Sequence, residues 1–533
     1  MSARRAWRHP VGLIALAALL VAGCASLPPG ADYPKPASNA LAHPEQTSLG
    51  RRLAAPSAAH PGLSGFHLLP VGIDSFLLRM EMEQQAERTL DVQYFVIEND
   101  DTGQLLHEAL LQAADRGVRV RLLLDDEGSH GRTAKLKPLA AHPNVELRVF
   151  NPSAYRGPVQ ALHDVELLAS ASRLNYRMHN KLFVVDNEIG IIGGRNIGNA
   201  YFQEGRDLEF GDYDVIAAGG IVKDMSASFD AYWNSPLVIP IEALFGSKPS
   251  VQDLDDYRAA LAAHHAGMSG KNYMGRLSGG EPLRDLVAGN APWIWARAEV
   301  IYDSPDKSKV EDGDEPGRRL RHRLAKAVEA SRSELLIVSP YVVPGDAGVK
   351  FLAKLRERGL QVRILTNSLA STDMPVVHSA YQGYRVPLLE MGIQLYEVRP
   401  VLGRPVVRGD ALKSPSAGQY ALHAKVFVFD RQRVFVGSMN LDRRSLHLNT
   451  EIGVIIDSPE LARQIATRFA AISQPANSYA LALDGTTATG GPALAWHTLE
   501  DGKPVEYHQE PAASIWRRVK VDMLSMLPLD ELL

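Results

Sequence analysis

Two stretches of the chain carry the same succession of hydrophobic patterns. In the first stretch, a dense apolar run at residues 90–96 predicts a strand, and apolar positions at helical spacing over 105–113 predict a helix that ends at Gly117. The apolar run 118–124 then predicts a second strand. This strand–helix–strand order predicts parallel strands with helices packed on the faces of a sheet.

The second stretch repeats this order. Residues 335–341 predict a strand, residues 349–355 a helix that ends at Gly359, and residues 362–365 a further strand. The repeat indicates an internal duplication. We therefore predict an α/β protein of two duplicated domains related by a pseudo-twofold axis, a pseudo-dimer within one chain, with one shared active site at the domain interface.

The N-terminal residues have the features of a bacterial lipoprotein signal peptide. Three arginines precede a short apolar run at residues 11–22, and small residues lead to Cys24. We expect cleavage before Cys24 and lipid modification of that residue; an uncleaved N-terminal anchor is the alternative. Because Cys24 is the only cysteine, no intrachain disulfide can form.

Shifts in composition divide the rest of the chain. A stretch rich in Pro and Ala predicts a tether, and the last residues place apolar side chains at helical spacing, with basic residues near the start of this pattern. The last pattern favours either a membrane-contacting helix or a helix docked on the body. The predicted segments are 1–24 (signal peptide), 25–65 (tether), 66–247 (first domain), 248–292 (helical insertion and linker), 293–475 (second domain) and 476–533 (C-terminal extension).

Each half also contains the pattern His-x-Lys-x-x-x-x-Asp followed by Gly-x-x-Asn. Residues two positions apart lie on one face of a strand, so the His and Lys of each motif can point at one ligand. Lys and Asn can stabilise the charge of a phosphodiester, and His can attack phosphorus or transfer a proton. The two motifs therefore predict one phosphodiester-cleaving site. Its residues are His179, Lys181 and Asn196 with His423, Lys425 and Asn440, and each Asn lies 17 positions after its His.

With these motifs the chain resembles the phospholipase D superfamily, and within it the bacterial cardiolipin synthase C type. The resemblance implies a covalent phosphatidyl-histidine, with His179 as nucleophile and His423 as general acid/base; the reverse assignment stays open because the motifs are nearly equivalent. It implies no metal and no cofactor, since two lysines supply the positive charge. Beside the motifs, it rests on residues 90–94, 114–121, 193–198, 365–370 and 448–451.

The resemblance further implies a carboxylate that orients each histidine, located after Gly-x-x-Asn. Glu451 fits in the second half and Asp212 in the first. The interval from the Asn is 11 residues for Glu451 and 16 for Asp212, so Glu209 and Asp214 remain competitors.

Four further residues are candidates for supporting or substrate-binding roles. The aspartates that close the motifs, Asp186 and Asp430, lie at an odd offset from the histidines, so we expect them on the opposite strand face in a supporting structural role. His378 and Tyr381 are candidates for the substrate pocket, although a structural role for that histidine is favoured.

The leading hypothesis is a phosphatidyltransferase that makes cardiolipin from phosphatidylglycerol and a second phospholipid, with phosphatidylethanolamine as one candidate. Hydrolysis to phosphatidic acid is the first alternative and a nuclease the second. The 533 residues carry a net charge of −4, whereas nucleic-acid-binding proteins usually have a basic surplus, so no nucleic-acid partner is expected. The expected location is the bacterial envelope, anchored through Cys24 and facing the periplasm, with the choice of membrane left open.

Overall fold

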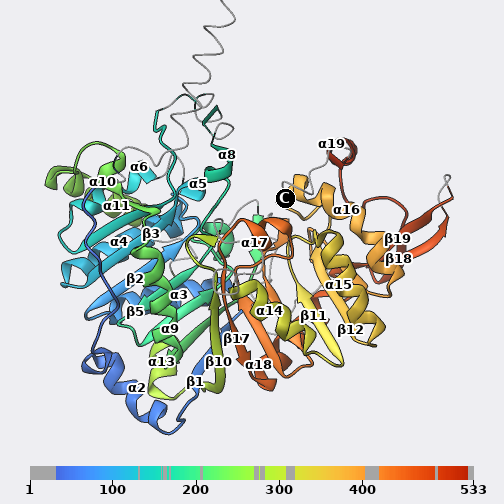
Figure 1. Ribbon diagram of the computed structural model, residues 1–533, viewed down its shortest axis with the longest axis horizontal. Coiled ribbons are helices and arrows are strands. Elements are labelled where there is room, and N and C mark those ends of the chain that lie inside the picture. Colours follow the sequence, from blue (N-terminus) through green and yellow to red (C-terminus); the bar gives the residue numbers. More distant parts are fainter. Residues whose placement is uncertain are drawn as a thin grey trace, which may run out of the picture.

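Two similar α/β halves lie side by side in the computed structural model (Figure 1). The structure describes residues 30, 32–129, 133–157, 159, 162, 165–166, 170–203, 208–268, 275, 282–307, 319–402, 419–486 and 490–525. The predicted duplicated α/β fold is confirmed, because the two halves arrange equivalent strands in the same order.

The strands of both halves join into one sheet. In the first half they run in the spatial order β9-β4-β3-β2-β5-β6-β8-β1, and in the second half in the order β10-β17-β16-β15-β11-β12-β13-β18. Antiparallel pairing of β1 with β10 connects the halves. The pseudo-twofold axis therefore passes between β1 and β10, and it relates β5 to β15 and β6 to β16, the strands next to the two motifs.

The strand bounds are as follows. The first half has β1 (Ser64–Leu69), β2 (Thr89–Tyr94), β3 (Arg119–Asp125), β4 (Val145–Phe150), β5 (Leu182–Val185), β6 (Ile189–Gly193), β8 (Asp214–Gly219) and β9 (Val238–Pro240). The second half has β10 (Ile294–Tyr302), β11 (Glu334–Val338), β12 (Gln361–Asn367), β13 (Gln394–Val398), β15 (Val426–Phe429), β16 (Arg433–Gly437), β17 (Ile452–Asp457) and β18 (Ser478–Thr486), extended by β19 (Pro492–Glu500) and β20 (Lys503–Tyr507).

Helices cover both faces of the sheet, which explains why the strand after each motif is apolar throughout. In β5, Phe183 and Val185 pack into the outer core of the first half, whereas Leu182 and Val184 pack into a central core built from both halves. The outer helices are α3 (Gly72–Gln85), α4 (Asp101–Asp115), α11 (Val251–Met268) and α13 (Pro282–Ala288) in the first half, and α14 (Arg319–Glu329), α15 (Gly345–Glu357) and α16 (Pro375–Glu390) in the second. The central core includes α9 (Ile221–Trp233) and α18 (Pro459–Ile472).

Residues 32–65 differ from the predicted tether, because they pack on the first half. Helix α2 (Ser48–Ala58) begins where the Thr47 side chain accepts a hydrogen bond from the Gly50 amide, and it buries Leu49 and Leu53 completely. These two leucines lie four residues apart and therefore on one helix face. The high Pro and Ala content of the segment hid this short amphipathic pattern.

In the part of the chain that the structure describes, no helix combines the length and the apolar character needed to cross a bilayer.

Candidate active site

Backbone pairing between the halves positions each histidine. Strand β7 (Leu208–Gly211) pairs in parallel with β14 (Gln419–Leu422), and the His423 amide donates to the Gly211 carbonyl at 2.8 Å. The equivalent contact in the other motif is a parallel bridge between Met178 and Thr450, where the His179 amide donates to the Thr450 carbonyl at 2.9 Å. As a result, the backbone just before His423 is paired with the backbone just before Asp212. In the same way, the residue before His179 is paired with the residue before Glu451.

As a result, each histidine pairs with a carboxylate from the opposite half. His423 Nδ1 lies 2.6 Å from Asp212 Oδ2, and His179 Nδ1 lies 2.8 Å from Glu451 Oε2. The two competitors have other partners: Glu209 accepts from Gln203, and Asp214 accepts from Arg79 at 2.9 Å. The structure therefore brings Asp212 to a histidine, and that histidine belongs to the opposite motif.

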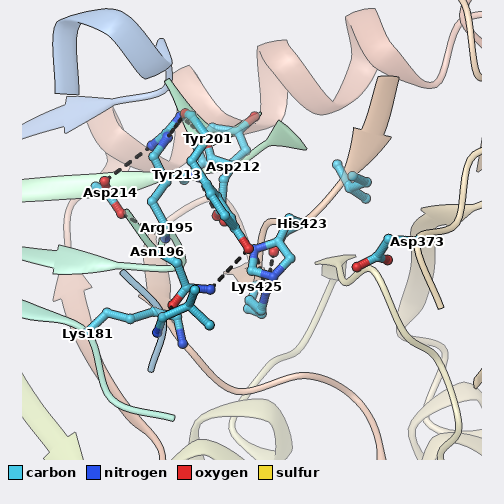
Figure 2. Close-up of polar contacts among 12 residues, drawn as sticks. Lys181, Arg195, Asn196, Tyr201, Asp212, Tyr213, Asp214, Asp373, His423 and Lys425 are labelled. Atoms are coloured by element: carbon cyan, nitrogen blue, oxygen red, sulfur yellow. Dashed lines mark hydrogen bonds and ion pairs between the residues drawn. The ribbon is translucent and has the colours of Figure 1, made fainter. Parts of the chain in front are cut away.

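Lys181, Asn196 and Lys425 lie around His423 (Figure 2). Lys425 Nζ lies 3.0 Å from His423 Nε2, and Lys181 Nζ donates to the His179 carbonyl at 2.7 Å. Asn196 Nδ2 donates to the Tyr201 hydroxyl at 3.0 Å. Asn440 is buried, and its Oδ1 has no hydrogen-bond partner among the described residues. The centre therefore combines hydrogen-bond donors, two histidines and two lysines, with Asp212 and Glu451 near enough to favour the charged form of each lysine.

Burial and mutual repulsion keep the basic groups at this centre easy to deprotonate. Burial, together with the charges of Lys181 and Lys425, lowers the pKa of His179 well below its ordinary value. Burial and Lys425 lower the pKa of His423 to about 4, even though Asp212 acts in the opposite direction. Burial lowers the pKa of Lys181 to about 7 and that of Lys425 to about 8. An anionic phosphodiester would offset this repulsion, so the site is electrostatically suited to bind one.

The two carboxylates differ in their protonation. Although burial acts to raise it, the hydrogen bond from His423 and the nearby cations lower the pKa of Asp212 to about 2. Burial dominates at Glu451 and raises its pKa to about 7. Asp212 is therefore ionised at neutral pH, whereas Glu451 is divided between its two forms.

The second residue of the Gly-x-x-Asn motif contacts the carboxylate, and it differs between the two halves. A Cβ on Gly194 would lie 2.3 Å from Asp212 Oδ1, so only glycine allows this close approach. The equivalent position in the second half is Ser438, whose hydroxyl donates to Glu451 Oε2. The near-identical motifs thus hold their carboxylates differently.

Three aromatic rings pack against the two histidines. The sequence analysis did not predict these contacts. Tyr201 and Phe210 each have a ring centroid 5.1 Å from that of His423. Phe95 lies 5.2 Å from His179 in an edge-on arrangement. Phe95 lies in the run 90–96 that was predicted as a strand and directly follows β2, whereas Tyr201 and Phe210, the latter in β7, lie in a stretch for which no strand or helix was predicted.

The aspartates of the motifs hold backbone at the far ends of their strands. Asp186 accepts hydrogen bonds from the amides of Glu87, Arg88 and Thr89 at 2.8–2.9 Å. Asp430 accepts equivalent bonds from the amides of residues 332–334. Both therefore fix the turn that leads into β2 or β11, and neither contacts a histidine in these hydrogen bonds.

The remaining candidates lie elsewhere. His378 and Tyr381 are buried on α16, where the His378 ring contacts Arg385 and Glu510. Cys24 lies outside the described residues. No cluster of three or more His, Cys, Asp or Glu residues that could hold a metal ion occurs within the described ranges.

Comparisons with known proteins agree with this geometry. A family model described as "Cardiolipin synthase, PLD-like domain" matches residues 80–233 and 324–473. Cardiolipin synthase C of Escherichia coli (strain K12) is 38% identical over 479 residues, which cover 89% of this chain and 97% of that protein. A cardiolipin synthase of Geobacillus sp. (strain WCH70) is 25% identical and covers 75% of this chain and 64% of its own length. The crystal structure of phosphatidylserine synthase from Haemophilus influenzae Rd KW20 shares the fold with a TM-score of 0.52 at 14% identity, over 81% of this chain and 92% of that one.

Proposed function

The chain belongs to the cardiolipin synthase family with phospholipase D-like domains, and from this we propose that it transfers a phosphatidyl group from one phospholipid to another through a histidine-bound intermediate. The donor and acceptor that fit this reaction are phosphatidylglycerol molecules, with phosphatidylethanolamine as an alternative donor. One observation carries the proposal: two histidine–carboxylate pairs, each built from both halves, meet around two buried lysines.

The protonation of the carboxylates supports distinct roles for the two histidines. Ionised Asp212 raises the pKa of His423, although burial and Lys425 hold it at about 4 in the free site. A bound anionic phosphodiester offsets the repulsion from Lys425 and favours the protonated His423 that a general acid needs. Glu451, with a pKa raised to about 7 by burial, gives His179 less such support. His179 therefore stays neutral more readily, and a neutral imidazole is what attacks phosphorus. We assign His179 as nucleophile and His423 as general acid/base.

The reaction then has two balanced steps. The lone pair of His179 Nε2 attacks phosphorus, the bond from phosphorus to the headgroup oxygen breaks, and His423 gives that oxygen its proton. In the second step the acceptor hydroxyl returns a proton to His423 as its oxygen attacks phosphorus, and the phosphorus–nitrogen bond to His179 breaks. Lys181, Lys425 and the motif asparagines stabilise the charge on the non-bridging oxygens in both steps.

Lipid analysis with purified enzyme tests the acceptor. Labelled phosphatidylglycerol is supplied alone or with phosphatidylethanolamine, and we expect cardiolipin together with free glycerol or ethanolamine. Phosphatidic acid as the sole product would mean that water is the acceptor and would reject the synthase proposal.

A substrate whose leaving group needs no proton tests the roles of the histidines. With a phosphatidyl ester of 4-nitrophenol, His423→Ala should still release nitrophenol once and accumulate a phosphatidyl-enzyme, whereas His179→Ala should release none. A burst from His179→Ala but not from His423→Ala would reverse the assignment. A burst from both variants would reject a histidine nucleophile in this pair.

We also propose that lipidation of Cys24 anchors the enzyme in the bacterial envelope on the periplasmic side. The basic residues, the apolar run and the small residues before Cys24 support this. Mass spectrometry of the mature N-terminus from cells should find Cys24 as the first residue with lipid on its thiol and its amine, and an unmodified Met1 would contradict the proposal.

A further inference from the structure

The C-terminal helix α19 (Ile515–Ser525) exposes an apolar face. Ile515 is 70% exposed, Trp516 82%, Val519 43% and Met523 65%. At about 100° per residue, these four side chains fall within an arc of about 100° on the helix. Single exposed apolar residues are common on proteins, but a tryptophan grouped with three aliphatic side chains on one helix face indicates a contact surface.

The opposite face of α19 fixes the helix to the second half. Val521 is fully buried and packs with Leu369 and Ala513. Arg517 donates to the Thr372 carbonyl at 2.5 Å. Helix α19 also packs against α16. In Figure 1, α19 lies at the edge of the molecule. The exposed face is therefore held in a defined orientation by a helix that is anchored on its other side.

The anchoring segment leads directly to the catalytic centre. Asp373, which follows Thr372, lies beside His423 (Figure 2) and within electrostatic range of both Lys425 and Arg517. Helix α19 thus stands at the rim of the centre on the His423 side.

We infer that this face of α19 inserts into the surface of an anionic phospholipid bilayer and brings the His423 side of the active site to the lipid headgroups. Tryptophan prefers the boundary between headgroups and acyl chains. Arg518 and Lys520 flank the apolar face, and three of the four charged residues of the helix are basic, which complements anionic lipid. The inference rests on the proposed function only in taking phospholipid as the substrate.

Trp516 itself provides the test of insertion. Full-length wild-type chain and Trp516→Phe are mixed with vesicles of phosphatidylglycerol and phosphatidylcholine, and the difference between their emission spectra isolates Trp516. We expect this emission to shift to the blue and to be quenched by lipids brominated on their acyl chains. Emission that does not change with vesicles would overturn the inference. A blue shift that appears without vesicles as protein concentration rises would assign the face to a second copy of the chain and would also overturn it.

A second measurement connects insertion to turnover and is independent of the first. Trp516→Glu with Val519→Glu should lower turnover of vesicular phosphatidylglycerol by about tenfold or more, while turnover of a monomeric short-chain phosphatidylglycerol stays unchanged. The matched control is Val251→Glu, which adds charge at a site that is 70% exposed on α11 in the other half. Equal loss on both substrates, or equal loss in the control, would refute the role of α19. A wild-type enzyme inactive on both substrates would reject the proposed function instead, and the fluorescence result would still decide insertion.

Discussion

Replacing Asp212 by Asn removes the ionised carboxylate that holds His423 Nδ1 at 2.6 Å. The fall of the Asp212 pKa from 3.8 to about 2 corresponds to roughly 2 kcal/mol of favourable interaction between the ionised group and its surroundings. If the protonated His423 of the transition state loses that support, the rate of transfer falls by roughly one to two orders of magnitude. The Tyr213 amide, which donates to Asp212 Oδ1 at 2.7 Å, can still donate to the amide oxygen of Asn, so the local backbone is expected to persist.

Glu451→Gln is the matched control for this experiment. Because the pKa of Glu451 is about 7, its neutral form is already substantially populated at neutral pH, and Gln resembles that form. The rate of cardiolipin formation is measured between pH 6 and 8, and thermal unfolding verifies that each variant is folded at the assay temperature. We expect the Glu451→Gln deficit to shrink as the pH falls to 6 and the Asp212→Asn deficit to stay constant. Wild-type turnover in Asp212→Asn, or an identical pH dependence of both deficits, would refute the assignment of unequal carboxylates.

Three further predictions follow from the geometry of the site. Gly194→Ala should lower kcat at least about tenfold, because the new Cβ would displace Asp212; unchanged kcat would contradict this crowding. Asp186→Ala should lower the free energy of unfolding in urea by about 2–4 kcal/mol, since three backbone amides lose their acceptor, and a loss of kcat without a loss of stability would refute the structural role. The value of kcat/KM should fall as the pH rises above about 7 to 8, because Lys181 and Lys425 then lose the charge that binds phosphate; a flat profile to pH 10 would reject this role.

The prediction of a tether was wrong for residues 32–65, because composition does not show that this segment packs on the first half. Over residues 32–65 the Pro and Ala content dominates the pattern, and only Leu49 and Leu53 mark the short helix that packs on the first half. Because two leucines at helical spacing are a weak signal, the tertiary contacts decide whether such a segment folds.

Local sequence determined how the strands next to the motifs pack. Alternation along β5 and β15 assigns their apolar residues to two different cores, and the structure has this arrangement. The His and Lys of each motif lie just before these strands, so the alternation itself does not place them. Such predictions succeed because the side-chain period of a strand depends only on the local backbone.

Only the tertiary structure decided which carboxylate serves which histidine. His423 and Asp212 are 211 residues apart in the sequence, and His179 and Glu451 are 272 apart, so both pairs form only when the halves dock about the pseudo-twofold axis. The same docking selects Asp212 over Glu209 and Asp214, despite the five extra residues before it. It also makes the two nearly identical motifs unequal, because burial and neighbouring charges set the pKa of each carboxylate, and these depend on packing rather than on the motif.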